Sequence, residues 1–155
     1  MTLDPETDLS FTRQLGADPA QLWTCWTTPL HLRAFFIPAP HAITACEIDL
    51  RPGGRFNTTF DVEGREIRNK GVFLEVEEER KLVFTDAYSE GWKPAPDPFM
   101  TAIVLFEPAV ARGTSLTIIA RHRSAEARER HEQMGFQAGW GVVADQLDAH
   151  AKTLP

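Results

Sequence analysis

The middle of the chain, residues 43–121, is a succession of short segments in which apolar and polar residues alternate, separated by tight turns. Alternation with a period of two puts one set of side chains on a buried face of a strand and the other set in solvent. Strands that follow one another through short turns pair in antiparallel fashion, because a parallel pair needs a long crossover connection. The sequence therefore predicts an antiparallel meander whose apolar face must be covered by another element.

The clearest turn in this region is Pro52-Gly53. Proline presets φ at the first central position of a turn, and glycine supplies a positive φ at the second. After the turn, Phe56, Thr58 and Phe60 share one face of the next strand. We therefore predict a hairpin with Gly53 at positive φ. Further strands are expected at residues 65–76, 82–85, 100–106 and 114–121.

The N-terminal part supplies a strand at residues 9–15 and then two short helices. Asp18-Pro19 and Thr28-Pro29 each join an N-cap residue to a proline suited to the first helical position. Both helices therefore lie between the first two strands.

One long helix is expected at the C-terminus, from the cap residue Ser124 to about His150. It carries an apolar stripe, which consists of Phe136, Trp140, Val143 and Leu147. Gly135, Gly139 and Gly141 fall within it, although a helical glycine costs roughly 1 kcal/mol against alanine. These glycines indicate close backbone approach or room left for another molecule.

Composition restricts the partners of the chain. The formal net charge is -6, which argues against nucleic acid, because phosphate binding needs a basic face. Arginines between residues 121 and 130 alternate with glutamates, as on a solvated helix. We find no apolar run near the ~20 residues of a membrane span and no signal-peptide core in the acidic N-terminus. The 155 residues fit one cytoplasmic domain, residues 1–155, with its core at about 9–152.

The sequence contains no pattern of cysteines or histidines that is typical of a metal, cofactor or redox site. Cys25 and Cys46 are too isolated for a metal cluster or a CxxC motif, so we expect two reduced thiols. Among the histidines, His122 with His131 comes nearest to a metal-ligand spacing, but zinc needs three or four ligands. We expect no metal and no cofactor.

Several motifs together resemble the SRPBCC superfamily, also called START-like. They are Pro19-x-x-x-Trp23-x-x-Trp26, Leu50-Arg51-Pro52-Gly53-Gly54-Arg55-Phe56, Leu82-Val83-Phe84-Thr85, Gly113-Thr114 and Gly139-Trp140. Within that superfamily the chain is most similar to the domains named after the activator of heat-shock protein 90 ATPase. The resemblance implies a helix-grip fold of class α+β, in which a curved antiparallel sheet wraps round a long C-terminal helix.

The superfamily uses one cavity for many tasks, among them lipid transfer, hormone reception and polyketide cyclisation, and no catalytic motif belongs to this branch. The expectation for this chain is binding of a small hydrophobic or aromatic ligand between the sheet and the C-terminal helix. The candidate ligand-binding residues are Phe56, Phe60, Phe84, Tyr88, Trp92, Phe99, Leu116, His122, Phe136 and Trp140. The proline-rich loop at residues 89–99 is either a lid over the cavity or a surface loop pinned by its two aromatic residues.

Two other functions stay open. One is a polyketide cyclase- or hydrolase-like enzyme in which His122, at the inward end of its strand, works as an acid–base pair with Asp86 or Tyr88. The other is a module that contacts a chaperone. The partner we expect is a small apolar molecule rather than nucleic acid or a membrane, and a homodimer remains an alternative to a monomer.

Overall fold

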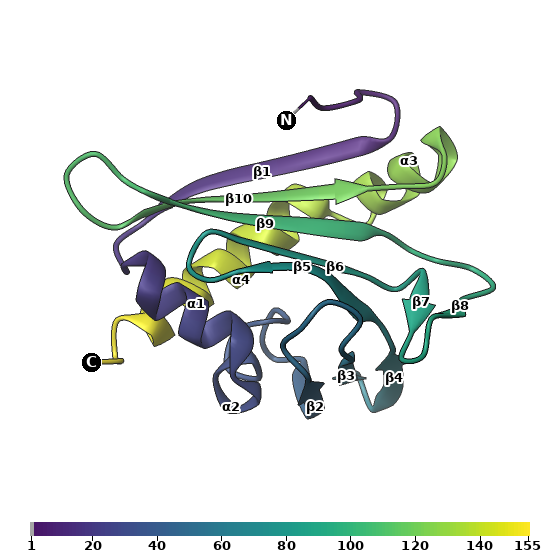
Figure 1. Cartoon of the computed structure of the whole chain (residues 1–155), viewed down its shortest axis with the longest axis horizontal. Coiled ribbons are helices and arrows are strands. Elements are labelled where there is room, and N and C mark those ends of the chain that lie inside the picture. Colours follow the sequence, from purple (N-terminus) through teal and green to yellow (C-terminus); the bar gives the residue numbers. More distant parts are fainter. Residues whose placement is uncertain (1) are drawn as a thin grey trace.

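The computed structural model describes residues 2–155. Figure 1 labels the helices and strands in chain order. The chain begins with β1 (Asp8–Leu15), α1 (Pro19–Thr27), α2 (Pro29–Leu32), β2 (Ala42–Ile48), β3 (Phe56–Val62), β4 (Arg65–Asn69) and β5 (Val72–Glu77). It continues with β6 (Lys81–Thr85), β7 (Tyr88–Ser89), β8 (Lys93–Pro94), β9 (Thr101–Pro108), β10 (Thr114–Arg121), α3 (Ala125–Gln133) and α4 (Phe136–Ala151).

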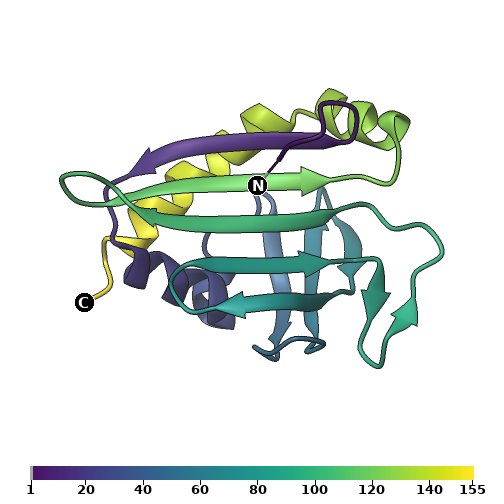
Figure 2. The ribbon, with the colours of Figure 1, turned by 45° about the horizontal axis from the view of Figure 1, so that its top comes forward.

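The larger sheet has five strands in the order β1-β10-β9-β6-β5, and every neighbouring pair is antiparallel. Its inner face is covered by α1 and α4, and α4 runs obliquely behind β1, β10 and β9 (Figures 1 and 2). The buried side chains of α4 that pack there are Phe136, Val143, Ala144, Leu147 and Ala151. The α+β architecture expected from the alternation and from the single apolar stripe is confirmed.

The second sheet, β2-β3-β4, continues the first around a bend. The two sheets are joined by an antiparallel bridge between Arg55 and Val72 and by a hydrogen bond of 2.9 Å from Phe56 N to the Gly71 carbonyl. The prediction of one strand over residues 65–76 is wrong, because the chain breaks at Lys70 and Gly71. A β-carbon at Gly71 would lie 2.5 Å from the Thr85 carbonyl oxygen, so only glycine allows this approach.

The expected signals at the turns and helix starts are present in the structure. Gly53 has φ +80° in the connection between β2 and β3. The Ser124 side chain accepts a hydrogen bond of 3.1 Å from Ala127 N at the start of α3, and Asp18 N donates to Gln21 Oε1 at the start of α1.

The C-terminal helix is interrupted, and the prediction of one continuous helix from Ser124 to His150 is wrong. Gly135 has φ +94° and separates α3 from α4. A left-handed residue cannot continue a right-handed helix, and glycine adopts that conformation without a steric cost. Because of this break, α3 does not continue the axis of α4 but lies beyond its N-terminal end, next to the end of β10 (Figure 1).

The two cysteines are free thiols, with Cys25 buried and Cys46 half-buried. None of the helices in residues 2–155 combines the length and the apolar character that a membrane crossing requires.

Candidate ligand-binding pocket

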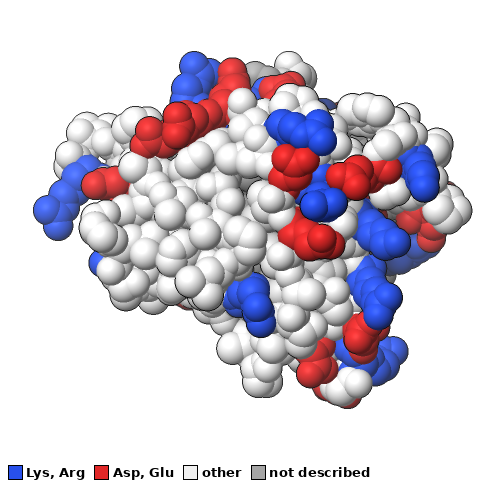
Figure 3. Space-filling model, turned by 60° about the horizontal axis from the view of Figure 1, so that its bottom comes forward, with Lys and Arg blue, Asp and Glu red and all other residues white. Residues whose placement is uncertain are grey.

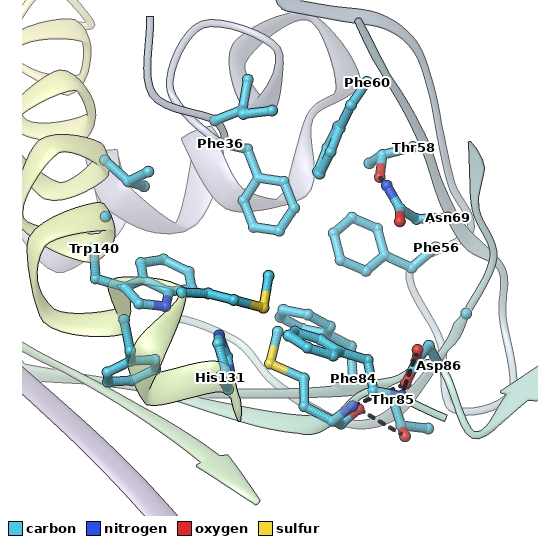
Figure 4. Close-up of a pocket in the computed structure, with 18 of the residues that line it drawn as sticks. Phe36, Phe56, Thr58, Phe60, Asn69, Phe84, Thr85, Asp86, His131 and Trp140 are labelled. Atoms are coloured by element: carbon cyan, nitrogen blue, oxygen red, sulfur yellow. Dashed lines mark hydrogen bonds between the residues drawn. The ribbon is translucent and has the colours of Figure 1, made fainter. Parts of the chain in front are cut away.

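A pocket of about 420 Å³ opens between the start of α4, the smaller sheet and the end of β6. This size lies within the range of small-molecule sites. Seven aromatic side chains line it: Phe36, Phe56, Phe60, Phe84, Phe99, Phe136 and Trp140. The seven residues come from five different parts of the chain. Figure 4 shows the rings of Phe36, Phe56, Phe60, Phe84 and Trp140 around one space.

The aromatic wall is held rigid by contacts among the rings themselves. Phe56 meets Phe84 edge to face with centroids 4.8 Å apart, and Phe36 lies 5.8 Å from Phe56. Trp140 stacks at 6.1 Å on Trp26, which is fully buried in the core. Such pairs prefer offset or edge-to-face geometry and stabilise by about 0.5–1.5 kcal/mol beyond their buried area. The pocket is therefore formed before any ligand enters.

Most of the aromatic candidates from the sequence meet at this pocket. Phe56, Phe60 and Phe84 face it from the strands, Phe136 and Trp140 from α4, and Phe99 from the segment before β9. The strand period predicts a common face for Phe56 and Phe60, and the apolar stripe predicts the two residues on α4.

Four candidates lie outside the pocket lining: Tyr88, Trp92, Leu116 and His122. Leu116 is buried in the core beside its cross-strand partner Phe106, which packs against Trp23 of α1. The expectation that Leu116 borders the cavity is therefore wrong, because its face is correct but its position along the strand is too close to α1.

The two aromatic residues of the proline-rich loop, Trp92 and Phe99, lie in different places. Tyr88 and Trp92 belong to the small β7–β8 hairpin and contact each other edge to face at 5.7 Å. Trp92 is 54% exposed and borders Gly53 rather than the cavity. Phe99 instead turns back to the pocket and lies 4.5 Å from the ring of His131.

Asp86 lines the pocket, but its carboxylate is occupied by backbone groups. Its oxygens accept hydrogen bonds of 2.8 and 2.9 Å from Phe99 N and one of 3.0 Å from Met100 N. The carboxylate thus fixes the segment that carries Phe99. Neither Asp86 nor Tyr88 reaches His122, so the structure does not assemble the acid–base pair considered from the sequence.

His122 is buried at the end of β10 and pairs with His131 of α3 instead. Its Nδ1 lies 2.8 Å from the Thr7 carbonyl oxygen, and its Nε2 lies 2.8 Å from His131 Nδ1. His131 lines the pocket, between Trp140 and Phe84 in Figure 4. Burial, together with the neighbouring His122, lowers the pKa of His131 from 6.5 to about 4.

His131 was a polar candidate near the open end of the cavity but was not among the predicted ligand-binding residues, and neither were Phe36, Thr58 and Asn69. The nine-residue spacing of His131 from His122 was visible, but the strand-to-helix turn that joins the two rings was not. Across the pocket, Asn69 Nδ2 donates to Thr58 Oγ1 at 3.2 Å. Within residues 2–155, no three histidine, cysteine, aspartate or glutamate side chains gather as a metal site would require.

Comparison with known proteins gives a consistent result. Residues 16–152 match the family model described as Activator of Hsp90 ATPase homolog 1-like protein. The crystal structure of a Nitrosomonas europaea protein is 38% identical, with a TM-score of 0.94 over 97% of each chain. A Mycobacterium smegmatis protein is 27% identical, with a TM-score of 0.78 over 96% of this chain and 93% of that one.

A more distant structure supports the fold alone. An AHSA1-like protein from Aeromonas hydrophila is 17% identical, with a TM-score of 0.70 over 94% of this chain and 92% of that one. No curated protein sequence matches the chain.

Proposed function

The chain belongs to the family of Activator of Hsp90 ATPase homolog 1-like proteins, and we propose that it binds a small, largely apolar molecule in the pocket beside α4. The observation that carries this proposal is the open space of about 420 Å³ lined by seven aromatic side chains. Closely packed interiors have few voids larger than a water molecule. A cavity of this size and lining is typical of a site that another molecule fills.

The affinity can be bounded from the apolar area. A bicyclic aromatic molecule that buries about 250 Å² gains roughly 6 kcal/mol at ~25 cal/mol per Å². Before the cost of immobilising the ligand is subtracted, that free energy corresponds to a dissociation constant of about 30 μM, which is the tightest binding that burial of this area supports. A cognate ligand that fills more of the pocket and adds hydrogen bonds binds more tightly.

The distribution of charge also supports a small molecule over nucleic acid. On the face drawn in Figure 3, basic side chains are interspersed with acidic ones and do not form a continuous basic stripe. The pocket lining itself has one basic residue, Lys70, and one acidic residue, Asp86. Burial of apolar surface is therefore the main source of affinity.

The proposal is tested with the purified protein and naphthalene as a probe. The NMR signals of the backbone amides around Phe36, Phe84 and Trp140, and of the Trp140 indole N–H, should shift as naphthalene is added. Half of the full shift should be reached at tens of micromolar naphthalene or above. The signals of Trp92, which lies outside the lining, serve as an internal control and should stay unchanged. Shifts confined to other surfaces, or no shifts at saturating probe, would rule the pocket out as the binding site.

A native mass spectrum of the same preparation identifies any small molecule retained from the expressing cell. The expected result is an added mass that is lost on denaturation and that prevents naphthalene from shifting the signals around Phe36, Phe84 and Trp140. If naphthalene still shifts those signals while the molecule is bound, the retained molecule binds outside the pocket.

A further inference from the structure

We propose that the pocket selects a ligand that carries a hydrogen-bond donor, such as the hydroxyl of an alcohol or a phenol, and that Nε2 of His131 is the group that accepts it. The inference rests on the proposed function and adds the chemical class of the ligand. It follows from a chain of hydrogen bonds that begins outside the pocket.

The chain starts at the carbonyl oxygen of Thr7, which can only accept. His122 Nδ1 lies 2.8 Å from this oxygen, so Nδ1 must carry the proton. A neutral imidazole has one donor and one acceptor nitrogen. In a neutral His122 ring, Nε2 is therefore an acceptor.

The next step fixes the state of His131. Its Nδ1 lies 2.8 Å from the acceptor Nε2 of His122, so Nδ1 of His131 must be the donor in that bond. The Nε2 atom of His131 is then left unprotonated, with a lone pair available. His122 is in this sense a positioning residue: it sets which nitrogen of His131 carries the proton but does not line the pocket.

The free nitrogen of His131 is accessible from the pocket. The ring lines the cavity, and its Nδ1 side faces His122, which lies outside the lining. Among residues 2–155, one side-chain nitrogen or oxygen atom is both fully buried and without a hydrogen-bond partner, and that atom is Trp26 Nε1, not His131 Nε2. Nε2 of His131 has no partner within those residues either, but it is not fully buried, so part of its surface is open. Because the ring lines the cavity and its Nδ1 is taken by His122, we infer that Nε2 opens toward the cavity.

Two polar side chains of the lining, Asp86 and Thr85, are held by other groups of the protein, whereas the side-chain oxygen of Asn69 on the opposite wall is a second acceptor without a partner among residues 2–155. Asp86 accepts from the backbone of Phe99 and Met100. Thr85 Oγ1 accepts from Ala87 N at 3.1 Å and lies 2.9 Å from Thr101 Oγ1. Both side chains are occupied within the protein.

A neutral ligand fits better than an anion. A carboxylate offers no proton to Nε2, and the two charged residues of the lining, Lys70 and Asp86, have opposite signs. Protonation of His131 to receive an anion is opposed by its burial and by His122, which lower its pKa. An alcohol or a phenol satisfies Nε2 without placing charge in the cavity.

The tautomer is tested first, on the unliganded wild-type protein. Nitrogen-15 NMR of the imidazole rings at neutral pH should show both His122 and His131 protonated at Nδ1 and unprotonated at Nε2. A His131 ring protonated at Nε2 would overturn the inference whatever ligands bind.

The ligand class is tested with four probes of one shape: naphthalene, 1-naphthol, 1-methoxynaphthalene and 1-naphthoate. An acceptor left unsatisfied in a buried site loses roughly 5- to 150-fold in affinity. We expect 1-naphthol to bind tighter than naphthalene and 1-methoxynaphthalene by a factor in that range, and 1-naphthoate to bind worse than 1-naphthol.

The variant His131→Phe keeps an aromatic wall and removes the acceptor, so the preference for 1-naphthol should fall to about twofold or less. The control variant is His31→Phe, because His31 also forms a histidine pair, with His150 at 3.0 Å, but lies outside the pocket lining. Its preference should equal that of the wild type.

The outcomes separate the two proposals. If all four probes bind with the same affinity, or if 1-naphthoate binds best, the donor-selecting role of His131 is refuted while the apolar pocket stands. If no probe binds, the proposed function itself fails, and the NMR tautomer still decides the state of His131.

Discussion

Gly139 offers a perturbation in which stability and binding move in opposite directions. It lies in the first turns of α4 and lines the pocket, and a β-carbon built on it would have no atom of the protein within 4 Å. Its hydrogen bond from N to the Gly135 carbonyl, 2.8 Å long, is that of a regular helix. The sequence left open whether the helix glycines mark close packing or room for another molecule, and at Gly139 the structure shows room.

Replacing Gly139 with leucine should therefore stabilise the fold and block the ligand. A helical glycine costs roughly 0.5–1 kcal/mol relative to leucine. In a chain of this length that gain raises the melting temperature by about 1–4 °C. The new side chain occupies space that the probe needs, and overpacking costs roughly 1–3 kcal/mol. We expect naphthalene to bind about 5- to 150-fold more weakly.

The assay combines thermal unfolding with calorimetric titration of naphthalene. Gly141→Ala is the matched control, because Gly141 is a glycine of the same helix outside the pocket lining. There the added β-carbon meets only the end of the Arg13 side chain, at 3.2 Å. The control should gain stability with unchanged affinity. Unchanged affinity in a folded Gly139→Leu variant would refute the placement of the ligand beside α4.

Three further predictions concern the histidine pair, the hairpin turn and the segment that carries Phe99. The folded pKa of His131 is lowered from 6.5 to about 4, so the unfolded chain binds the proton first as the pH falls. The free energy of unfolding of the wild type should fall by up to roughly 3 kcal/mol relative to that of His131→Phe between pH 6.5 and pH 4. If the free energies of the two proteins, measured with denaturant, change with pH in parallel, the prediction is contradicted. Gly53→Val should destabilise by more than about 1 kcal/mol, because φ is +80° and a β-carbon would lie 3.0 Å from the Trp92 ring; an unchanged melting temperature would show that the turn tolerates the substitution. Asp86→Ala removes the acceptor of two backbone N–H groups, those of Phe99 and Met100. It should speed amide exchange at residues 99 and 100 and lower the free energy of unfolding by about 1–3 kcal/mol, whereas unaltered protection there would exclude this role of the carboxylate.

The sequence predicted the elements whose signals are local. Alternation identified the strand faces, and the Pro52-Gly53 pair identified a turn whose glycine has φ +80°. The breaks at Gly71 and Gly135 were missed for a common reason. Glycine permits both a regular and a bent backbone, and at Gly71 the choice is set by the approach of the Thr85 carbonyl, a contact made by a distant residue.

The pocket shows the same division between local and tertiary information. A period of two gives the face of a side chain but not its place along the cavity, which is why Phe84 lines the pocket while Leu116 packs near α1. His122 is buried as the strand period indicated, yet its partner is His131. That pairing depends on how α3 turns back over the end of β10, and no local pattern specifies that angle.

The most direct test of donor recognition in the pocket is a crystal structure of the protein with 1-naphthol. We expect the bicyclic ring between Phe84 and Trp140, with its hydroxyl oxygen about 3 Å from His131 Nε2. A ring bound elsewhere on the molecule would contradict the binding site, and a ring in the pocket with its hydroxyl turned away from His131 would contradict the recognition of a donor.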